Sequence, residues 1–157
     1  MNKILNIKKA TELSKQLKQE GKSVVLIGGC FDVLHTGHVE FFKKAKTYGD
    51  VLFVLLESDE TIKKLKGKNR PIHTQTDRAK VLATIEPINT IIMLPQLENN
   101  NDYDSLISKL KPTIIATTTG DPNRYHKERQ AKLIQAKVID VVSRIKNKST
   151  NQLTKLL

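Results

Sequence analysis

The sequence predicts an α/β fold, a doubly wound parallel sheet of about five strands with flanking helices. Five short apolar runs typical of strands alternate along the chain with patterns typical of helices. This alternation favours parallel strands joined by helical crossovers. The length of 157 residues suits one domain that is large enough to bury a sizeable core.

The apolar runs and the helical patterns give each element its expected bounds. Strands are expected at Val24–Ile27, Val51–Leu56, Thr90–Leu94, Thr113–Thr117 and Lys137–Val142. Helices are expected at residues 9–20, 38–48, 75–86, 102–110, 123–136 and 149–157. The first helix carries Ala10, Leu13 and Leu17 on one side and ends at a glycine, Gly21. Gly49 is expected to be the C′ residue of the second helix. We therefore expect a single domain over residues 1–157, with the leading helix in 1–22 and the core in 23–157.

The stretch from Asp59 to Thr76 is predicted to be a functional loop. It combines several basic side chains with two turn signals, and long loops in compact α/β domains often carry function. Ligands of an open parallel sheet bind beyond the carboxyl ends of its strands, where the winding direction reverses. The first predicted strand ends at Gly28–Gly29, and the loops after Leu56 and Thr117 are expected to flank that point.

The charge balance indicates an anionic partner. Lysine and arginine exceed aspartate and glutamate by 27 to 16, a net charge of +11. A basic chain can bind nucleic acid or attract phosphorylated small molecules. Only five of the basic residues are arginine, and the seven aromatic residues are scattered, so they offer no stacking platform for single strands. The composition therefore favours solvated lysines and a positive basin for phosphates over specific nucleic-acid binding.

Cysteine usage and hydropathy restrict the cellular setting. The single cysteine excludes an intramolecular disulfide and a cysteine-rich zinc site. The N-terminus lacks an apolar signal core, and no apolar run approaches the roughly 20 residues that span a bilayer. We expect a cytoplasmic protein with no membrane partner.

The segment from Gly28 to His38 predicts a phosphate-binding turn. It follows a buried strand and leads into a helix, whose first turn has free N–H groups and the positive end of the helix dipole. His35 and His38 are three residues apart and therefore share one helix face. Gly37 has no β-carbon, so a phosphate chain can approach the backbone closely. The imidazoles add donors to those of the amides.

Other interpretations of these residues are weaker. The two histidines have a spacing that zinc accepts, but a zinc site needs a third protein ligand. An incidental pair of surface histidines is a further alternative. The chain has no G-x-G-x-x-G and no P-loop, because Gln16 stands where the first glycine of a P-loop would be. Cys30 beside the turn is interpreted as structural, and Asp32 as a residue that caps or organises the turn and the phosphorylated substrate.

These residues resemble a known family. The pattern G-x-F-D at 29–32 followed by H-x-G-H at 35–38 resembles the cytidylyltransferase-like nucleotidyltransferases, which join a nucleoside triphosphate to a phosphorylated small molecule and release pyrophosphate. The resemblance continues through Leu65–Gly67, Arg70–Pro71 and Asp77–Arg78 to Gly120–Asp121, and ends near Ser149–Thr150. It implies a Rossmann-like sheet and Mg²⁺ carried by the nucleotide, with no protein metal site.

One branch of the group looks most similar. The lead-in at 20–25 and the segment 58–72 resemble the heptose-1-phosphate adenylyltransferases, which implies ATP and a sugar phosphate. Glycerol-3-phosphate cytidylyltransferases, with phosphonate acceptors as a variant, and archaeal-type FAD synthases share the same core motifs. The branch usually has a lysine just before the aspartate of Gly120–Asp121, and here Thr117–Thr119 lack it. Members are often dimers, which leaves both a monomer and a homodimer open.

The resemblance assigns roles to particular side chains. The catalytic residues it implies are His38, Lys66 and His35. The nucleotide-binding residues it implies are Cys30, Phe31, His35, Gly37, His38, Arg78, Asp121, Ser149 and Thr150. The substrate-binding residues it implies are Asp32 and Lys66. The competing class is a non-catalytic binder of nucleotides or nucleic acid, but binding alone does not need the histidine pair together with Lys66 and Arg78.

Overall fold

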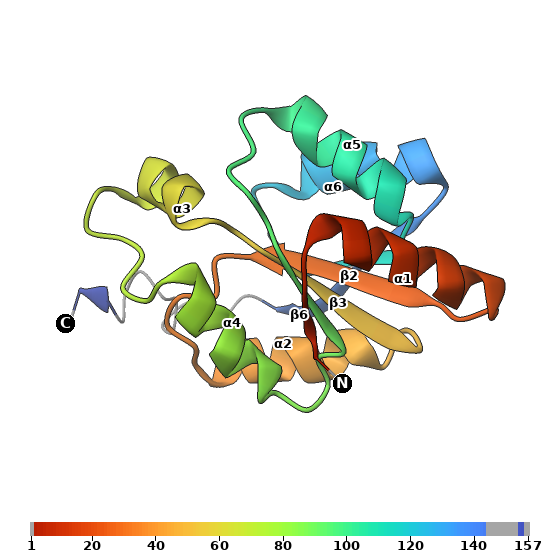
Figure 1. The fold of residues 1–157 in the computed structure, drawn as a ribbon, viewed down its shortest axis with the longest axis horizontal. Helices are drawn as coiled ribbons and strands as arrows, with labels where there is room; N and C mark the ends of the chain where they lie inside the picture. Colours follow the sequence, from red (N-terminus) through yellow and green to blue (C-terminus); the bar gives the residue numbers. More distant parts are fainter. Residues whose placement is uncertain (1, 144–153, 156–157) are drawn as a thin grey trace.

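A computed structural model describes residues 2–143 and 154–155, and in it a parallel sheet lies between two layers of helices (Figure 1). The six strands are β1 Ile4–Leu5, β2 Val24–Gly29, β3 Val51–Leu56, β4 Thr90–Met93, β5 Ile114–Thr119 and β6 Lys137–Ser143. The six helices are α1 Ile7–Gln19, α2 Thr36–Lys46, α3 Asp59–Lys66, α4 Gln75–Ala83, α5 Asn100–Leu110 and α6 Arg124–Ile134. The predicted fold class is confirmed.

The two faces of the sheet bury separate hydrophobic clusters. Val25 and Ile27 of β2 pack with residues of α2 and α4, while Val24 and Leu26 pack with residues of α1, α5 and α6. Successive side chains of a strand point to opposite faces, so a strand covered on both sides is apolar throughout. This is why β2 and β3 are continuous apolar runs rather than alternating ones.

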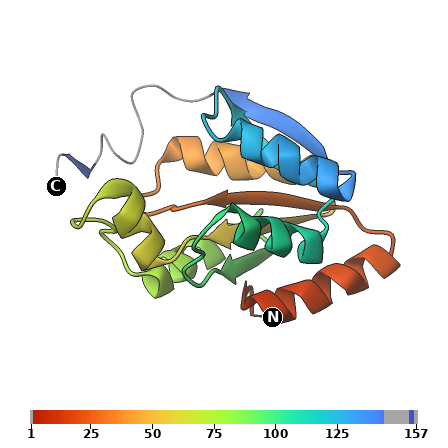
Figure 2. The same ribbon diagram turned by 90° about the horizontal axis from the view of Figure 1, so that it is seen from above.

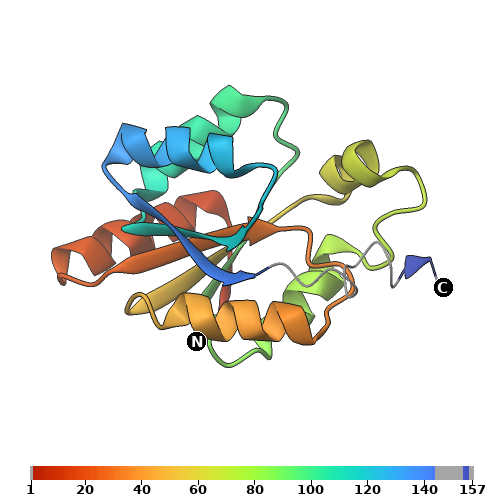
Figure 3. The same cartoon turned by 180° about the vertical axis from the view of Figure 1, so that it is seen from behind.

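The strand order places a topological switch point between β2 and β5. The order is β1-β4-β3-β2-β5-β6, and every pairing is parallel. The chain winds from β2 to β3 and β4 in one direction, then returns to add β5 and β6 on the other side of β2. Figures 2 and 3 show α3 beyond the carboxyl ends of the strands, at the end of the sheet where α2 begins. The expected ligand-binding edge is therefore formed by the segments after β2, β3 and β5.

Several local expectations need correction. The strand β1 was not predicted, because two residues paired with the edge strand β4 are too few to show a period. The predicted loop between Asp59 and Thr76 is wrong over its first half, where α3 forms. The Ser58 side chain caps this helix by accepting from the Thr61 amide, and only Thr61 and Ile62 of the helix are buried. The helix expected at 149–157 lies outside the described residues except for Thr154 and Lys155.

The two glycines predicted to end helices behave differently. Gly21 follows α1 with a φ of +72°, which confirms it as the residue that ends that helix. The prediction for Gly49 is wrong, since α2 ends at Lys46 with Thr47 as its C-cap. Gly49 is instead required by close packing, because a β-carbon there would lie 2.7 Å from Cγ2 of Val25.

No helix among the described residues is long and apolar enough to cross a membrane.

Candidate active site

The two histidines of the H-x-G-H motif form the start of α2. His35 is the N-cap residue, and its Nδ1 accepts a hydrogen bond of 3.0 Å from the Gly37 amide. His38 is the third residue of the helix, and its Nδ1 accepts one of 3.2 Å from the His35 amide. This is a reciprocal capping box, in which both imidazoles do what hydroxyl and carboxylate side chains usually do. The two ring centroids are 4.0 Å apart.

These contacts define which nitrogen of each ring carries the proton. A backbone N–H can only donate, so Nδ1 of both histidines must present a lone pair, and in the neutral ring the proton is on Nε2. Burial, with smaller contributions from the neighbouring His35 and the charge of Lys66, lowers the pKa of His38 to about 4. At neutral pH His38 is therefore an uncharged donor through Nε2–H.

The ring of Phe31 packs against His38. Its ring is buried and meets the His38 ring edge-on, with centroids 5.7 Å apart. The residue has a φ of +47°, and its ring lies so close to Gly29 that a β-carbon there would be 2.9 Å from Cζ. The sequence predicted that Phe31 contacts the nucleotide, and the structure shows where its ring lies: in the core, supporting His38.

Asp32 joins the turn to the segment that precedes α4. Its buried carboxylate accepts hydrogen bonds from the amides of Ile72 and His73, at 2.7 and 2.9 Å, and from Nε of Arg70 at 2.9 Å. Burial alone would raise the pKa of Asp32, but these donors outweigh it and lower the pKa. The Asp32 carboxylate thus holds the turn against the segment before α4, and its contact with the phosphorylated substrate stays a prediction.

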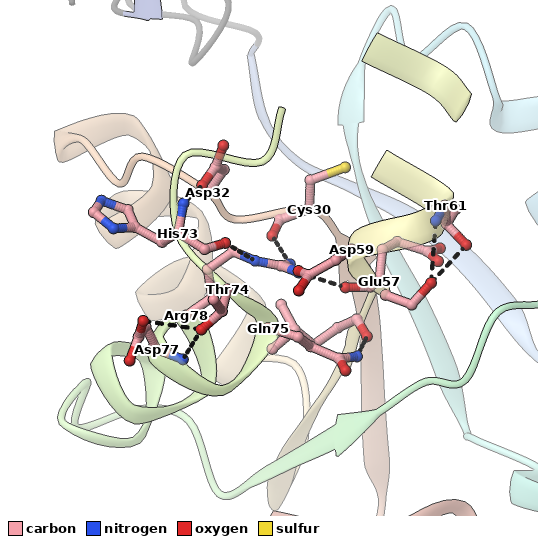
Figure 4. Close-up of polar contacts among 12 residues, drawn as sticks. Cys30, Asp32, Glu57, Asp59, Thr61, His73, Thr74, Gln75, Asp77 and Arg78 are labelled. Atoms are coloured by element: carbon pink, nitrogen blue, oxygen red, sulfur yellow. Dashed lines mark hydrogen bonds and ion pairs between the residues drawn. The ribbon is translucent and has the colours of Figure 1, made fainter. Parts of the chain in front are cut away.

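Arg78 lies in the interior, at the centre of the polar contacts drawn in Figure 4. Its Nη1 donates to the carbonyl of Cys30 at 2.7 Å, and its Nε donates to the carbonyl of His73 at 3.1 Å. Its Nη2 donates to the carbonyl of Glu57 at 2.9 Å and to the carboxylate of Asp59 at 2.8 Å. The side chain was predicted to contact a phosphate. In this structure its guanidinium instead joins the ends of β2 and β3 to the segments before α3 and α4.

Lys66 and Cys30 lie near the histidines. Lys66 is the last residue of α3 and is exposed, and its charge lowers the pKa of His38. Burial raises the pKa of the Cys30 thiol, against the opposing influence of Lys66. The thiol is therefore protonated at neutral pH, and the roles predicted for Cys30 stay predictions.

Asp121 follows β5 on the other side of the switch point. It accepts hydrogen bonds from Oγ1 of Thr117 at 2.5 Å and from the Asn123 amide at 2.8 Å, and it forms an ion pair with Lys127. Burial alone would raise the pKa of Asp121, but these donors, Lys127 first, lower it. Lys127 of α6 thus places a cation beside Asp121, in a chain that lacks the lysine expected just before Gly120. Sequence reasoning missed this residue because it lies on the next helix.

A carboxylate and a phenol near the turn were also missed. Glu57 comes directly after β3, and Oη of Tyr103 donates to its two carboxylate oxygens at 3.1 and 2.9 Å. No motif contains either residue, and they are 46 positions apart in the chain. Ser149 and Thr150, the remaining predicted nucleotide-binding residues, lie outside the described residues.

The fold and the donor pair define the class of protein. An open parallel sheet with two neutral imidazole donors and a helix N-terminus at its switch point is an α/β domain built to hold phosphate groups. The comparison with known families agrees: residues 26–154 match the model of the cytidylyltransferase-like family. This match covers most of the chain, which therefore belongs to that family.

Curated relatives are similar over about two thirds of the chain. The Bifunctional protein HldE of Nitratiruptor sp. is 45% identical over 103 residues, or 66% of this chain and 21% of that protein. The Bifunctional protein HldE of Aliarcobacter butzleri is 41% identical over 104 residues, again 66% of this chain and 21% of that protein. The chain spans about a fifth of the length of the curated relatives it matches.

Two solved structures have a similar fold. The lipopolysaccharide core biosynthesis protein from Thermoplasma volcanium has a TM-score of 0.65 and 26% identity, over 80% of this chain and all of that chain. The pantoate-beta-alanine ligase from Francisella tularensis has a TM-score of 0.68 over 98% of this chain and 72% of that chain, and its 18% identity shows a shared fold alone.

Proposed function

We propose that this chain is a nucleotidyltransferase that joins ATP to a phosphorylated sugar, with heptose 1-phosphate as the first candidate, and releases pyrophosphate. The observation that carries the proposal is the pair of imidazoles at the start of α2, whose Nδ1 atoms both accept from backbone amides, so that each neutral ring carries its proton on Nε2. The choice of ATP and of a sugar phosphate is supported by the relatives named Bifunctional protein HldE and by the solved lipopolysaccharide core biosynthesis protein.

In the proposed reaction a phosphate oxygen of the acceptor attacks the α-phosphorus of the nucleotide. A new P–O bond forms, the bond between the α-phosphorus and its bridging oxygen breaks, and that oxygen leaves with pyrophosphate. Mg²⁺ carried by the nucleotide would neutralise phosphate charge. Among the residues that the structure describes, no group of three or more His, Cys, Asp or Glu could hold a metal ion.

The protein would contribute positioning and charge stabilisation. His38 would donate from Nε2 to the charge that develops on the phosphate oxygens, and His35 would hold a neighbouring phosphate. Because both rings are fixed by backbone hydrogen bonds, their donors need no reorganisation during the reaction. Lys66, at the exposed C-terminal end of α3, would contact the triphosphate on the side opposite the histidines. Positioning of reactants alone can supply about 7–11 kcal/mol of a barrier.

A screen for pyrophosphate release tests the proposal. ATP and CTP are each combined with heptose 1-phosphate, glycerol 3-phosphate, FMN and simple phosphonates. We expect the highest rate with ATP and a sugar 1-phosphate. A preference for CTP with glycerol 3-phosphate or a phosphonate would refute the sugar assignment and keep the reaction class. Nucleotide binding without pyrophosphate from any pair would instead favour a non-catalytic binder.

The variant His38→Asn tests the imidazole donor. The asparagine oxygen can replace Nδ1 as the acceptor of the His35 amide, whereas the Nε2 donor is lost. We expect turnover to fall by about 100-fold, the scale for losing one preorganised transition-state donor, while the melting temperature stays close to that of the wild type. His126→Ala on α6 is the control and should retain activity. Near-normal turnover of a folded His38→Asn protein would remove this histidine from catalysis.

A further inference from the structure

Glu57 is a half-buried carboxylate at the edge of the site, and it accepts a hydrogen bond from Tyr103. Tyr103 of α5 donates its one hydroxyl proton across both carboxylate oxygens. Among residues 2–143 and 154–155, none of the ion pairs involves Glu57. Burial raises the pKa of Glu57, and the Tyr103 hydrogen bond and the charge of Arg78 only partly offset this. Burial and Glu57 raise the pKa of the Tyr103 phenol, so the phenol keeps its proton at neutral pH and acts as a hydrogen-bond donor to Glu57.

Glu57 lies on the side of the site where the acceptor, rather than the nucleotide, would bind. Its amide donates to the carbonyl of Gly29 at 3.2 Å, so it lies beside the turn that leads to the histidines. It follows β3, while Asp121 follows β5, and β2 separates the two strands. A nucleotide extending from the histidines toward β5 would leave the β3 side for the second substrate. Arg78 donates to the carbonyls of both Cys30 and Glu57, at 2.7 and 2.9 Å, so these two residues lie near each other.

The donor count of this pair indicates what it would bind. An ionised carboxylate has about four acceptor positions, and Tyr103 supplies one proton. A buried carboxylate is costly unless further donors satisfy it. A ligand with several hydroxyl groups would provide such donors without adding charge. A cationic ligand is disfavoured, because the cationic side chain of Arg78 already donates to the Glu57 carbonyl at 2.9 Å and the chain carries a net charge of +11.

We infer that Glu57, held by Tyr103, forms the subsite that binds hydroxyl groups on the sugar part of the acceptor. This inference rests on the proposed function. It assigns the choice between acceptors to the segment after β3 and to α5. Glu57 and Tyr103 select the acceptor in this scheme, and the phosphate-handling groups at α2 are separate from them.

Binding measurements test the subsite without turnover. Calorimetry is performed on the full chain saturated with α,β-methylene-ATP, and the probes are heptose 1-phosphate, methyl phosphate and ethanolamine phosphate. Methyl phosphate has the phosphate and no hydroxyl, so the affinity ratio of heptose 1-phosphate to methyl phosphate isolates hydroxyl recognition. We expect Glu57→Gln to reduce this ratio by about 10- to 100-fold, as for the loss of a hydrogen bond to a charged group. Affinity for the nucleotide analogue should stay within about twofold.

Matched controls separate the subsite from general damage. Glu12→Gln, on the exposed face of α1, is the control for Glu57→Gln. Tyr48→Phe, at the opposite end of the sheet from the site, is the control for Tyr103→Phe. Both should leave the ratio unchanged. Tyr103→Phe removes a donor that lowers the pKa of Glu57, so the pKa of Glu57 should rise in this variant. As the pH is lowered, binding of heptose 1-phosphate should therefore begin to weaken at a higher pH than in the wild type. A purely structural role for Tyr103 would not move this pH profile.

The outcomes are distinguishable from those of the proposed function. Pyrophosphate release by the wild type together with an unchanged ratio in Glu57→Gln would overturn the inference alone. A wild type that binds heptose 1-phosphate no better than methyl phosphate, or that prefers ethanolamine phosphate, would also overturn it. An equal loss of nucleotide affinity in Glu57→Gln would assign the residue to the nucleotide and reject the subsite. Glu57-dependent sugar binding without pyrophosphate release would support the subsite and count against the transferase.

Discussion

Replacement of Arg78 by methionine should destabilise the protein strongly. The guanidinium makes four hydrogen bonds, three to backbone carbonyls and one to the carboxylate of Asp59, and its side chain has no solvent exposure. Methionine fills part of the volume but leaves all four acceptors without this donor. Hydrogen bonds from a charged group contribute about 1.5–3 kcal/mol each, but here they share one side chain and are not additive. Breaking a buried ion pair typically costs about 3–5 kcal/mol, and we expect that range.

Thermal unfolding measures this cost. For a chain of this size 1 kcal/mol corresponds to about 2–4 °C, so the melting temperature of Arg78→Met should fall by about 6–20 °C. Arg124→Met is the matched control, because Arg124 pairs with Glu128 and Asp140 at a partly exposed position where such pairs contribute at most about 1 kcal/mol. Arg78→Lys should be nearly as unstable as Arg78→Met, because a single lysine ammonium cannot reach all four acceptors that the planar guanidinium binds in the wild type.

The result that would refute this reasoning is specific. If Arg78→Met melts within about 2 °C of the Arg124→Met control, the buried network does not contribute to stability. If the same variant also raises KM for the nucleotide, Arg78 contacts a phosphate, as the sequence predicted. A large loss of stability with KM and kcat both altered would instead confirm that Arg78 acts by positioning the segments around the site.

Further predictions concern three single positions. Nuclear magnetic resonance should give His38 a pKa of about 4 in the free protein, and added nucleotide should raise it, because phosphate charge favours the protonated ring; a pKa near 6.5 would contradict its burial. The pKa of His38 is about 6.5 in the unfolded chain and about 4 in the folded protein, so the unfolded chain binds this proton first as the pH falls. The free energy of unfolding should therefore decrease between about pH 6.5 and pH 4. Lys66→Ala should lower kcat/KM by about 10- to 100-fold in steady-state assays, with Lys63→Ala as the control, and equal effects of the two would argue against a specific phosphate contact. Gly49→Ala should cost about 1–3 kcal/mol in denaturant unfolding, because its β-carbon would lie 2.7 Å from Cγ2 of Val25, and a neutral effect would show that Val25 moves freely.

The parts of the site that could be predicted are those encoded within a few residues. His35 and His38 are three positions apart at a helix start, so the sequence alone indicates a shared face and a supply of donors. Their reciprocal capping was not predicted, because histidine is an unusual residue for that role. The helix α3 was missed because it buries little and carries lysines that are equally typical of a loop.

Contacts between distant segments could not be predicted. Arg78 and Cys30 are 48 positions apart, and nothing in a single sequence distinguishes a buried arginine from one that faces a ligand. Lys127 beside Asp121 and Tyr103 beside Glu57 are further examples. Each pairing depends on how helices pack against the ends of the strands.

The sequence by itself determined the α/β class, five of the six strands in the described part of the chain and the position of the turn between β2 and α2, because periodicity and helix-start chemistry are local properties of the chain. Only the tertiary structure decided the protonated nitrogen of each histidine, the inward position of Arg78 and the environment of Glu57. These depend on burial and on hydrogen-bond partners contributed by other segments, and such partners come together only when the sheet has formed.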